Sequence, residues 1–380
     1  MRKFACELST QGIETLAGDR DSQRFEARRF THLSRIIPVC RVVYNPAMKD
    51  IYWKLRESLR SNPVVAKAVY LAQSFGYWMC GDVGRKIRNA AKAAGTGDGV
   101  ALCIRIRDEA PNLRELVEYY LAAGVRHIFF YEARSGDDFH AVLDPFVEAG
   151  VVTLIENWPH VPISPAAEHD CVLRCIGRFA WLGCIDADEF VVIGDGRKID
   201  AFLHSLPQKV PALALHWRYY GSNGHIKRPA LPVILAYSRR HAETNRHVKV
   251  FLRPERATRC RNSHTWFYSG AFAAAKNENG RNVYGSISLP PTSEHAWINH
   301  YFHKSKEEFD AKGSRASVLD VVGMNFNYRT AAKGAEHDAT ANAVEDLAAV
   351  EYHRSVCRLR DCSICAALSQ CPRDRQVCVV

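Results

Sequence analysis

The stretch WLGCIDADEF, residues 181–190, places an apolar run directly before two aspartates and a glutamate. Short apolar runs bounded by polar residues are typical of buried strands. In an extended backbone Asp186 and Asp188 point to the same side, and two carboxylates held so close repel each other unless they share a proton or a cation. A hard divalent cation, Mg²⁺ or Mn²⁺, takes oxygen ligands and keeps positions open for phosphate. The stretch therefore predicts a metal site for a phosphate-bearing ligand at the end of a buried strand.

The sequence before this stretch alternates between strand-like and helix-like segments. Strands are predicted over residues 100–106, 125–132 and 151–156, and helices over 111–124, 141–150 and 168–181. Such alternation indicates βαβ units and a mainly parallel sheet with helices on both faces. Ligands of these sheets bind at the carboxyl ends of the strands. We expect an acid-lined cleft there, formed by the aspartates and by the loops at 107–112, 132–138 and 156–162.

The composition is that of a globular protein, with 47% hydrophobic and 24% charged residues in a chain of 380. Residues 1–95 contain 17 Lys and Arg against 8 Asp and Glu, and the remainder contains 34 against 33. Most of the net charge of +10 thus belongs to the N-terminal region and not to the domain with the aspartates. No helix-turn-helix, zinc-finger or aromatic-basic sheet signature accompanies the charge, so no nucleic-acid partner is expected.

The N-terminal region raises the question of membrane contact. Its first 20 residues have no apolar run behind the basic start, which predicts a cytoplasmic protein. The most apolar segment, residues 63–80, contains Lys67 and is shorter than the ~20 residues that a membrane span requires. Two alternatives remain open for it. It is either part of a helical hairpin packed on the main domain, or an interfacial helix through which residues 46–95 contact anionic lipid peripherally.

Thirteen cysteines are present, and five of them lie close to the C-terminus. This cluster contains one Cys-x-x-Cys pair, Cys362 and Cys365, which alone is a weak signal for zinc. The sequence favours reduced thiols in a surface tail. The alternative is a structural Zn²⁺ bound by Cys357, Cys362, Cys365 and Cys371.

Several motifs occur in a fixed order along the chain. CIRIRDEAPNLRELVEYYLAAGVRHIFFYEARSGDD (103–138) and IDADEF (185–190) are followed by HWRYYGSNGH (216–225), HVKVFLRPERATRCRNSHTW (247–266) and HYFHKSKEEFDAKGSR (300–315). Together they resemble the GT-A glycosyltransferases of family 92 and the related family 2 type, over about residues 100–350. Asp108, Leu116 and Tyr120 depart from the usual Asn, Trp and His of that group, so the first loop is expected to favour a different base or sugar.

The resemblance implies an α/β GT-A fold, that of nucleotide-diphospho-sugar transferases, with a mainly parallel mixed sheet and helices on both faces. This domain is expected over residues 96–352. A basic helical region, 1–95, precedes it and a Cys-rich tail, 353–380, follows it.

The activity implied is the metal-dependent transfer of a hexose from a nucleoside diphosphate sugar to a glycan hydroxyl. The favoured donor is a UDP-sugar. The implied ligands of Mn²⁺ or Mg²⁺ are Asp186, Asp188 and His300, with His264 as the alternative histidine. The residues implied to bind the nucleotide sugar are Arg107, Glu109, Ser135, Asp138, Asp186, Lys249 and Lys304. Glu189 either binds a backbone group or a lysine, or contacts a sugar hydroxyl. For an inverting reaction the base candidates, among which the sequence does not choose, are Glu243, Glu255 and Glu294.

Two other classes of function remain as alternatives. A nucleotidyl- or phosphotransferase also places paired aspartates on a metal, but the chain has neither a Gly-rich phosphate loop of the GxxxxGK[ST] type nor a kinase catalytic loop. The other alternative is a glycan- or nucleic-acid-binding protein that uses the basic N-terminal region.

Overall fold

The computed structural model describes residues 62–80, 82–95, 97–158, 165–270, 273–314 and 331–370. The chain divides into two compact units, Met1–Cys80 and Gly81–Val380. The two-unit division places the boundary 15 residues before the one predicted at residue 95, because the helix that follows Gly81 packs within the second unit.

The described part of the first unit is helix α4 (Pro63–Cys80), which agrees with the helix expected there. The helix begins after Asn62, whose side-chain oxygen accepts hydrogen bonds from the backbone N–H groups of Val64 and Val65. Within the described ranges, no helix is both long enough and apolar enough to cross a bilayer. Residues 46–61 of the predicted membrane-contact region lie outside the described residues.

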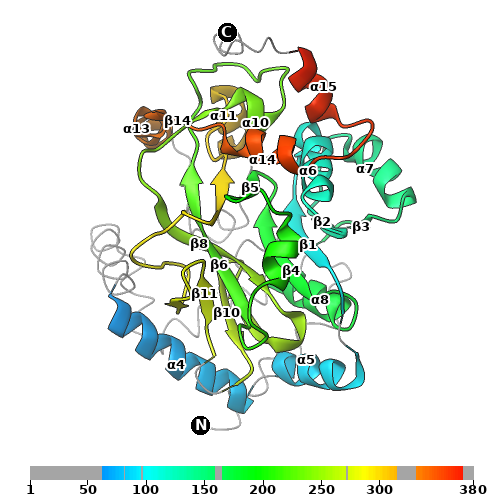
Figure 1. The fold of residues 1–380 in the computed structure, drawn as a ribbon, viewed down its shortest axis with the longest axis vertical. Coiled ribbons are helices and arrows are strands. Elements are labelled where there is room, and N and C mark those ends of the chain that lie inside the picture. Colours follow the sequence, from blue (N-terminus) through cyan, green and yellow to red (C-terminus); the bar gives the residue numbers. More distant parts are fainter. Residues whose placement is uncertain are drawn as a thin grey trace, which may run out of the picture. The chain divides into compact units, whose positions relative to one another are not determined.

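Four strands form the parallel half of the large sheet in the second unit, in the order β3-β2-β1-β4 (Figure 1). They are β1 (Val100–Ile106), β2 (His127–Glu132), β3 (Val152–Ile155) and β4 (Trp181–Asp186). The side chains of β1, β2 and β4 are buried almost throughout, as expected for parallel strands covered on both faces. The strands predicted over 100–106, 125–132 and 151–156 and their parallel pairing are confirmed.

The other half of the sheet is mixed and is made by strands from later in the chain. Antiparallel β8 (Asn245–Leu252) lies between β4 and β6 (Ala212–Tyr219), and β13 (Ala296–His300) pairs in parallel with β6. Strand β5 (Glu189–Ile193) pairs with β13, so that Glu189 lies opposite His300. The remaining strands are β7 (Arg239–Arg240), β9 (Ala257–Asn262), β10 (Thr265–Tyr268), β11 (Ala275–Asn277), β12 (Asn282–Val283) and β14 (Val344–Glu345).

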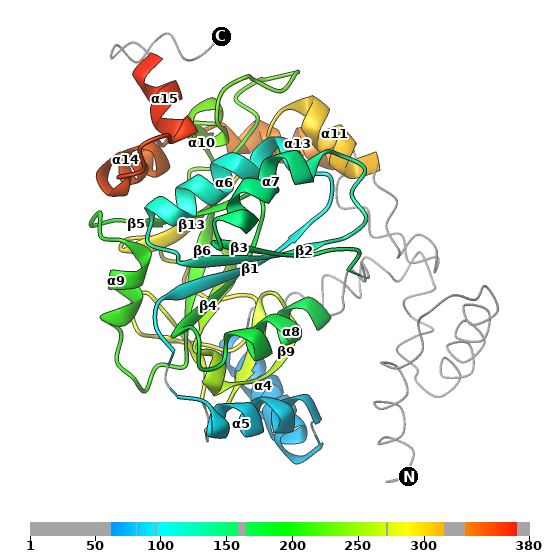
Figure 2. The ribbon, with the colours of Figure 1, turned by 90° about the vertical axis from the view of Figure 1, so that its right-hand side faces the viewer.

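Helices cover both faces of the sheet. Helices α6 (Ala110–Ala122) and α7 (Phe139–Glu148) lie on one face, and α8 (Ala166–Cys175) and α5 (Asp82–Ala93) on the other (Figure 2). The predicted fold class, α/β of the GT-A type with a mixed sheet between helices, is confirmed. The remaining helical segments are α9 (Ile199–His204), α10 (Val233–Ala236), η1 (Pro254–Arg256), α11 (Lys306–Ser314), α13 (Ala331–Ala341), α14 (Ala348–Val356) and α15 (Ser363–Gln370).

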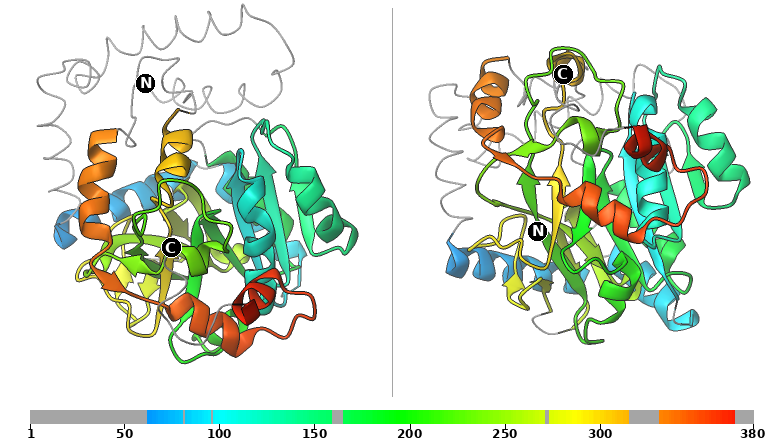
Figure 3. Two further views of the ribbon diagram at one scale, coloured as in Figure 1. Left: turned by 90° about the horizontal axis from the view of Figure 1, so that it is seen from above. Right: turned by 45° about the horizontal axis from the view of Figure 1, so that its top comes forward.

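The described part of the Cys-rich segment belongs to the packed domain. Helices α14 and α15 lie beside α6 in both views of Figure 3, and Val356, Cys362 and Ile364 are buried in the same core cluster as the sheet. A surface tail of thiols, which the sequence favoured for this segment, is therefore wrong for residues 353–370. Cys371 and Cys378 lie outside the described residues.

Candidate active site

The candidate site lies where β4 ends and the chain turns into β5. The carboxyl ends of β1, β2 and β4 meet at this edge of the sheet, because the three strands are parallel and in register. The amino end of antiparallel β8 reaches the same edge. The predicted strand over the motif is therefore two strands, with Ala187 and Asp188 in the turn between them.

Asp186 forms an ion pair with a lysine from the neighbouring strand. The Lys249 Nζ lies 2.8 Å from the Asp186 Oδ2, and the lysine side chain is fully buried while that of Asp186 remains 42% exposed. Burial works to raise the pKa of Asp186, but the Lys249 ammonium outweighs it and brings the pKa to about 2. Asp186 is thus an ionised carboxylate with one face open to a ligand.

Asp188 is buried and faces cationic and imidazole groups. Its Oδ2 accepts a hydrogen bond of 2.9 Å from the Lys312 Nζ, and its Oδ1 lies 3.6 Å from the His300 Nε2. Burial opposes ionisation, yet the Lys312 ammonium holds the pKa of Asp188 well below its ordinary value. Burial also lowers the pKa of His300, so its imidazole is neutral at pH 7.

Glu189 turns away from these two carboxylates and holds the turn. Its Oε2 accepts a hydrogen bond of 2.9 Å from the backbone N–H of Asp186 and lies 3.7 Å from the Lys249 Nζ. Burial raises the pKa of the Glu189 carboxyl well above its ordinary value. These contacts match the first of the two alternatives for Glu189, the one with a backbone group and a lysine.

Glu109 and Lys304 extend the charged group toward the end of β1. The Glu109 carboxylate lies 2.9 Å from the Lys312 Nζ and 3.7 Å from the Lys304 Nζ. Although burial favours the neutral acid, these lysines lower the pKa of Glu109 to about 2. Lys312 therefore bridges Glu109 and Asp188, 79 residues apart in the sequence.

The loop residues expected to bind a nucleotide mainly hold the loops together. The Ser135 hydroxyl accepts a hydrogen bond from the backbone N–H of Asp108, and Asp138 caps α7 by accepting one from the N–H of Ala141. Asp137, which sequence reasoning missed, accepts one from the N–H of Ala110 at the start of α6. Arg107 at the end of β1 is one-third exposed at the same edge.

Comparison with known proteins places this site in a known family. The family model for glycosyltransferase family 92 matches residues 98–345, which include every residue of the site described above. The chain belongs to glycosyltransferase family 92. The resemblance to this family that the sequence motifs indicated is confirmed.

Curated relatives in the same family come from plants. A family 92 protein of Ricinus communis is 26% identical over 251 residues, covering 65% of this chain and 43% of the relative. One of Arabidopsis thaliana is 24% identical over 290 residues, covering 72% of this chain and 47% of the relative. The family 92 chain described here thus spans less than half the length of these relatives.

Solved structures show a fainter likeness. A mannosyltransferase of Pyrobaculum calidifontis in complex with GDP-Man and Mn²⁺ has 16% identity and a TM-score of 0.26, over 40% of this chain and 46% of that one. A Mycobacterium tuberculosis glucosyl-3-phosphoglycerate synthase in complex with Mn²⁺ and UDP has 15% identity and a TM-score of 0.23, over 35% of this chain and 47% of that one. A likeness at this level says nothing about the ligands of the family 92 chain.

The structure brings only two of the three predicted metal ligands together. Asp188 and His300 are adjacent, and each aspartate is paired with a lysine, Asp186 with Lys249 and Asp188 with Lys312. Among the described residues, the one group of three or more Asp, Glu, His or Cys ligand atoms within 4.8 Å of one another lies elsewhere, around His353. Asp188 still fits Mg²⁺ or Mn²⁺, because such ions are held in proteins by one or two carboxylates and take their other ligands from substrate phosphates and water, and His300 beside it offers a nitrogen atom as a further ligand.

His264, the alternative histidine, serves the fold around the site. Its Nδ1–H donates a hydrogen bond of 2.8 Å to the backbone oxygen of Val248, and its ring packs edge-on against Trp217. Trp217 also contacts the ring of His300, at a centroid distance of 4.6 Å. His264 and Trp217 therefore position the His300 imidazole beside Asp188.

The three candidate bases are exposed and lie at different places. Glu243 precedes β8 and so lies at the carboxyl edge of the sheet, as the site does. Glu255 follows β8 in η1, beyond Leu252, which pairs with Leu182 near the start of β4, so it lies at the opposite edge. Glu294 precedes β13, whose first residue is four positions, roughly 13 Å, from His300.

Lys312 is a second residue that sequence reasoning missed. It is one of several charged residues in α11, and its spacing there gives no signal that it differs from the exposed ones. Only the fold places it between Glu109 and Asp188.

Proposed function

We propose that this family 92 glycosyltransferase transfers a hexose from a nucleoside diphosphate sugar to a hydroxyl of a glycan. The favoured donor is a UDP-sugar. The observation that supports this most is the buried Asp188 carboxylate beside the neutral His300 imidazole, at the edge of the sheet where ligands of α/β proteins bind. We include in the proposal a divalent cation, Mn²⁺ or Mg²⁺, held by Asp188 and His300.

The charge balance of the site supports the need for such a cation. Three ionised carboxylates face three lysines: Glu109, Asp186 and Asp188 against Lys249, Lys304 and Lys312. The formal charge of this group is near zero, so a diphosphate entering it brings negative charge that the group itself does not offset. A bound cation supplies that compensation and stabilises the charge that develops on the departing diphosphate.

The residues of the chain then have separate roles in the proposal. Asp188 and His300 hold the cation. Lys304 pairs with Glu109, and Lys312 pairs with both Glu109 and Asp188. Both lysines stabilise the diphosphate oxygens. Asp186, whose carboxylate is partly exposed and fixed by Lys249, accepts hydrogen bonds from the ribose hydroxyls. Glu243 is the one of the three candidate bases that lies at the carboxyl edge.

Transfer is tested with the full chain, a panel of UDP- and GDP-hexoses and glycan acceptors, by measuring the nucleotide released. We expect free nucleoside diphosphate and a glycosylated acceptor. Asp188→Asn preserves the shape of the side chain and should reduce transfer at least 100-fold, on the order of 3 kcal/mol of transition-state stabilisation. Asp195→Asn, at an exposed ion pair with Arg197, is the matched control and should leave transfer unchanged. Full transfer by Asp188→Asn would contradict the role of the site, and release of hexose 1-phosphate in place of nucleoside diphosphate would favour the nucleotidyltransferase alternative.

The cation is tested separately from transfer. With a nucleotide sugar that supports transfer, activity should rise with added Mn²⁺ or Mg²⁺ and saturate, and His300→Gln should raise the concentration needed for half-maximal activity. Transfer that does not respond to either ion in metal-depleted protein would show that the lysines suffice, and would leave the glycosyltransferase proposal standing.

A further inference from the structure

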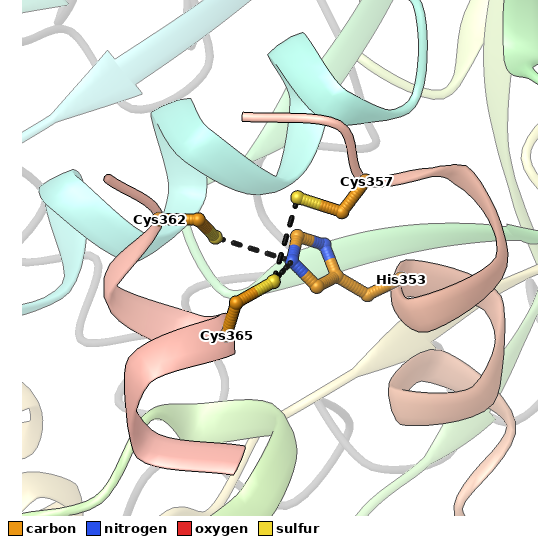
Figure 4. Close-up of side chains that lie close together, drawn as sticks. All are labelled: His353, Cys357, Cys362 and Cys365. Carbon is orange, nitrogen blue, oxygen red and sulfur yellow. Dashed lines mark hydrogen bonds between the residues drawn. The ribbon is translucent and has the colours of Figure 1, made fainter. Parts of the chain in front are cut away.

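A second cluster of side chains that can bind a metal lies beside α6. In the sequence it follows the residues matched by the family model. Its members are His353, Cys357, Cys362 and Cys365 (Figure 4). His353 and Cys357 are four residues apart at the end of α14, and Cys362 and Cys365 are three apart at the start of α15. Residues three or four apart lie on the same face of a helix, so each helix end contributes two ligands to one point.

The distances within the cluster are those of a tetrahedral site. The His353 Nε2 lies 3.3 Å from the Cys362 Sγ and 3.7 Å from the Cys365 Sγ, and the Cys357 and Cys365 sulfurs are 3.5 Å apart. With Zn–S bonds of about 2.3 Å and Zn–N bonds of about 2.1 Å, tetrahedral zinc places two sulfurs about 3.8 Å apart and a sulfur and a nitrogen about 3.6 Å apart. All four ligand atoms lie within 4.8 Å of one another.

We propose that His353, Cys357, Cys362 and Cys365 bind a structural Zn²⁺ ion. Four protein ligands of the Cys₃His type close the coordination sphere, which is the mark of a structural zinc site and leaves no position for substrate. Binding displaces the three thiol protons to solvent and leaves three thiolates on the metal. The site differs from the set suggested by the cysteine spacing alone, because the fourth ligand is His353 and not Cys371.

A disulfide is the other chemistry open to neighbouring thiols. A Cys357–Cys365 bond would require the sulfurs to move from 3.5 Å to about 2.0 Å apart, and it would need an oxidant to take up two electrons. It would also leave His353 and Cys362 without a role. The convergence of all four residues favours the metal.

The contacts around the cluster show what the zinc would stabilise. The Glu118 carboxylate of α6 accepts hydrogen bonds from the backbone N–H and the hydroxyl of Ser363, which fixes the start of α15. On the other side, the His353 ring stacks on Tyr119 of α6, with ring centroids 5.6 Å apart. The zinc site therefore joins α14 and α15 to α6.

The same helix supports the strand that follows the aspartates. The Tyr119 hydroxyl donates to the backbone oxygen of Val191, and the Tyr120 hydroxyl donates to that of Glu189, both at 2.8 Å. Loss of zinc is therefore expected to weaken the contacts of α6 with β5, without removing any group that contacts the nucleotide sugar.

The test begins with the full chain purified without chelators and its metal content measured by mass spectrometry. We expect about one zinc per chain. Substitution with Co²⁺ should give the visible absorption of a tetrahedral thiolate-bound ion. Protein without zinc that also fails to bind added Zn²⁺ or Co²⁺, or an intact mass lower by two hydrogen atoms because of a Cys357–Cys365 disulfide, would overturn the proposal.

Matched variants separate metal binding from folding. Cys362→Ser should lose the zinc, whereas Cys175→Ser changes a buried cysteine outside the cluster and should keep it. If Cys362→Ser does not fold, Cys365→His, which gives a Cys₂His₂ set, should still bind Co²⁺ with fewer thiolate bands. Asp188→Asn should keep the zinc in full, so the outcome for this site is independent of the proposed function.

Discussion

The residues of the candidate active site are arranged as alternating charges, and this arrangement predicts how stability depends on pH. Glu109 is buried between Lys312 and Lys304, and its pKa in the folded protein is about 2. In the unfolded chain a glutamate has a pKa of about 4.3. Between these values the unfolded chain binds the proton more readily, so the free energy of unfolding falls as the pH falls from about 4.3 to 2.

Glu109→Gln removes this contribution. At pH 7 the variant should be less stable than the wild type by roughly 2–3 kcal/mol, and the difference should shrink as the pH approaches 2. The measurement is urea denaturation at several pH values. Glu148→Gln, at an exposed site at the end of α7, is the control and should follow the wild type throughout. A Glu109→Gln variant with the wild-type pH dependence would show that the lysines do not stabilise the carboxylate.

For individual residues, the sequence predicted which side chains belong to the site more readily than it predicted which of them form ion pairs. Asp186, Asp188 and His300 belong to motifs that can be read in order along the chain, and the structure places Asp188 beside His300. The pairing of Asp186 with Lys249, and of Asp188 with Lys312, depends on which strands and helices meet. Charged residues are frequent on exposed surfaces, so no local signal shows that a lysine such as Lys249 is buried.

At the scale of elements, β4 is tightly packed, as Gly183 shows. This strand lies between β1 and β8, and a Cβ at Gly183 would lie 2.5 Å from the Phe251 Cε1 and 2.7 Å from the Leu102 Cδ2. Both neighbours are buried side chains of adjacent strands, so neither has free space to move into. The small residue three positions before Asp186 therefore allows the strand that carries the site to sit at the centre of the sheet.

Gly183→Ala should lower the free energy of unfolding by about 1–3 kcal/mol, the usual cost of overpacking a core. Gly285→Ala is the control, because a Cβ there meets nothing within 4 Å. Thermal or urea denaturation compares the two variants. A Gly183→Ala protein as stable as the wild type would mean that Phe251 and Leu102 repack without cost.

Elements were predictable where local patterns determine them. Apolar periodicity predicted α6 and the four parallel strands, whose connections are short βαβ units. The predicted helix over 168–181 is shorter in the structure, because α8 ends at Cys175 and Gly177 then adopts a left-handed backbone with φ of +74°. The pairing of β5 with β13 joins residues more than 100 positions apart, and no local pattern specifies such a contact.

For the whole molecule, the position of α5 decides where the second unit begins. The change in charge near residue 95 suggested that the basic region ends there, but charge does not report packing. Ile87 on α5 is fully buried and belongs to the core cluster that contains residues of α8 and β9. Ala94 lies just after the helix, and its Cβ would be 2.6 Å from a Cβ added at Gly177. The helix is thus basic on its exposed side and part of the core on the other.

Two truncations test this boundary. A chain of residues 81–380 keeps α5 and should fold cooperatively and retain sugar transfer, because the site and its support lie within that unit. A chain of residues 96–380 lacks Ile87 and the alanines that pack beside it, and exposes the apolar faces of α8 and β9. Burying one isoleucine contributes about 1.5–3 kcal/mol, so the loss of the helix should lower the melting temperature by several degrees.

The same pair of proteins tests the membrane hypothesis for the N-terminal region. If residues 46–80 supply most of the lipid contact, the full chain should sediment with anionic vesicles and the 81–380 chain should not, at equal transfer activity. Salt should weaken sedimentation of the full chain, because basic residues act through screened charge. Equal sedimentation of the two proteins would show that residues 1–80 are not needed for vesicle binding. In the truncation test, a 96–380 chain as stable as the 81–380 chain would place the domain boundary at residue 95.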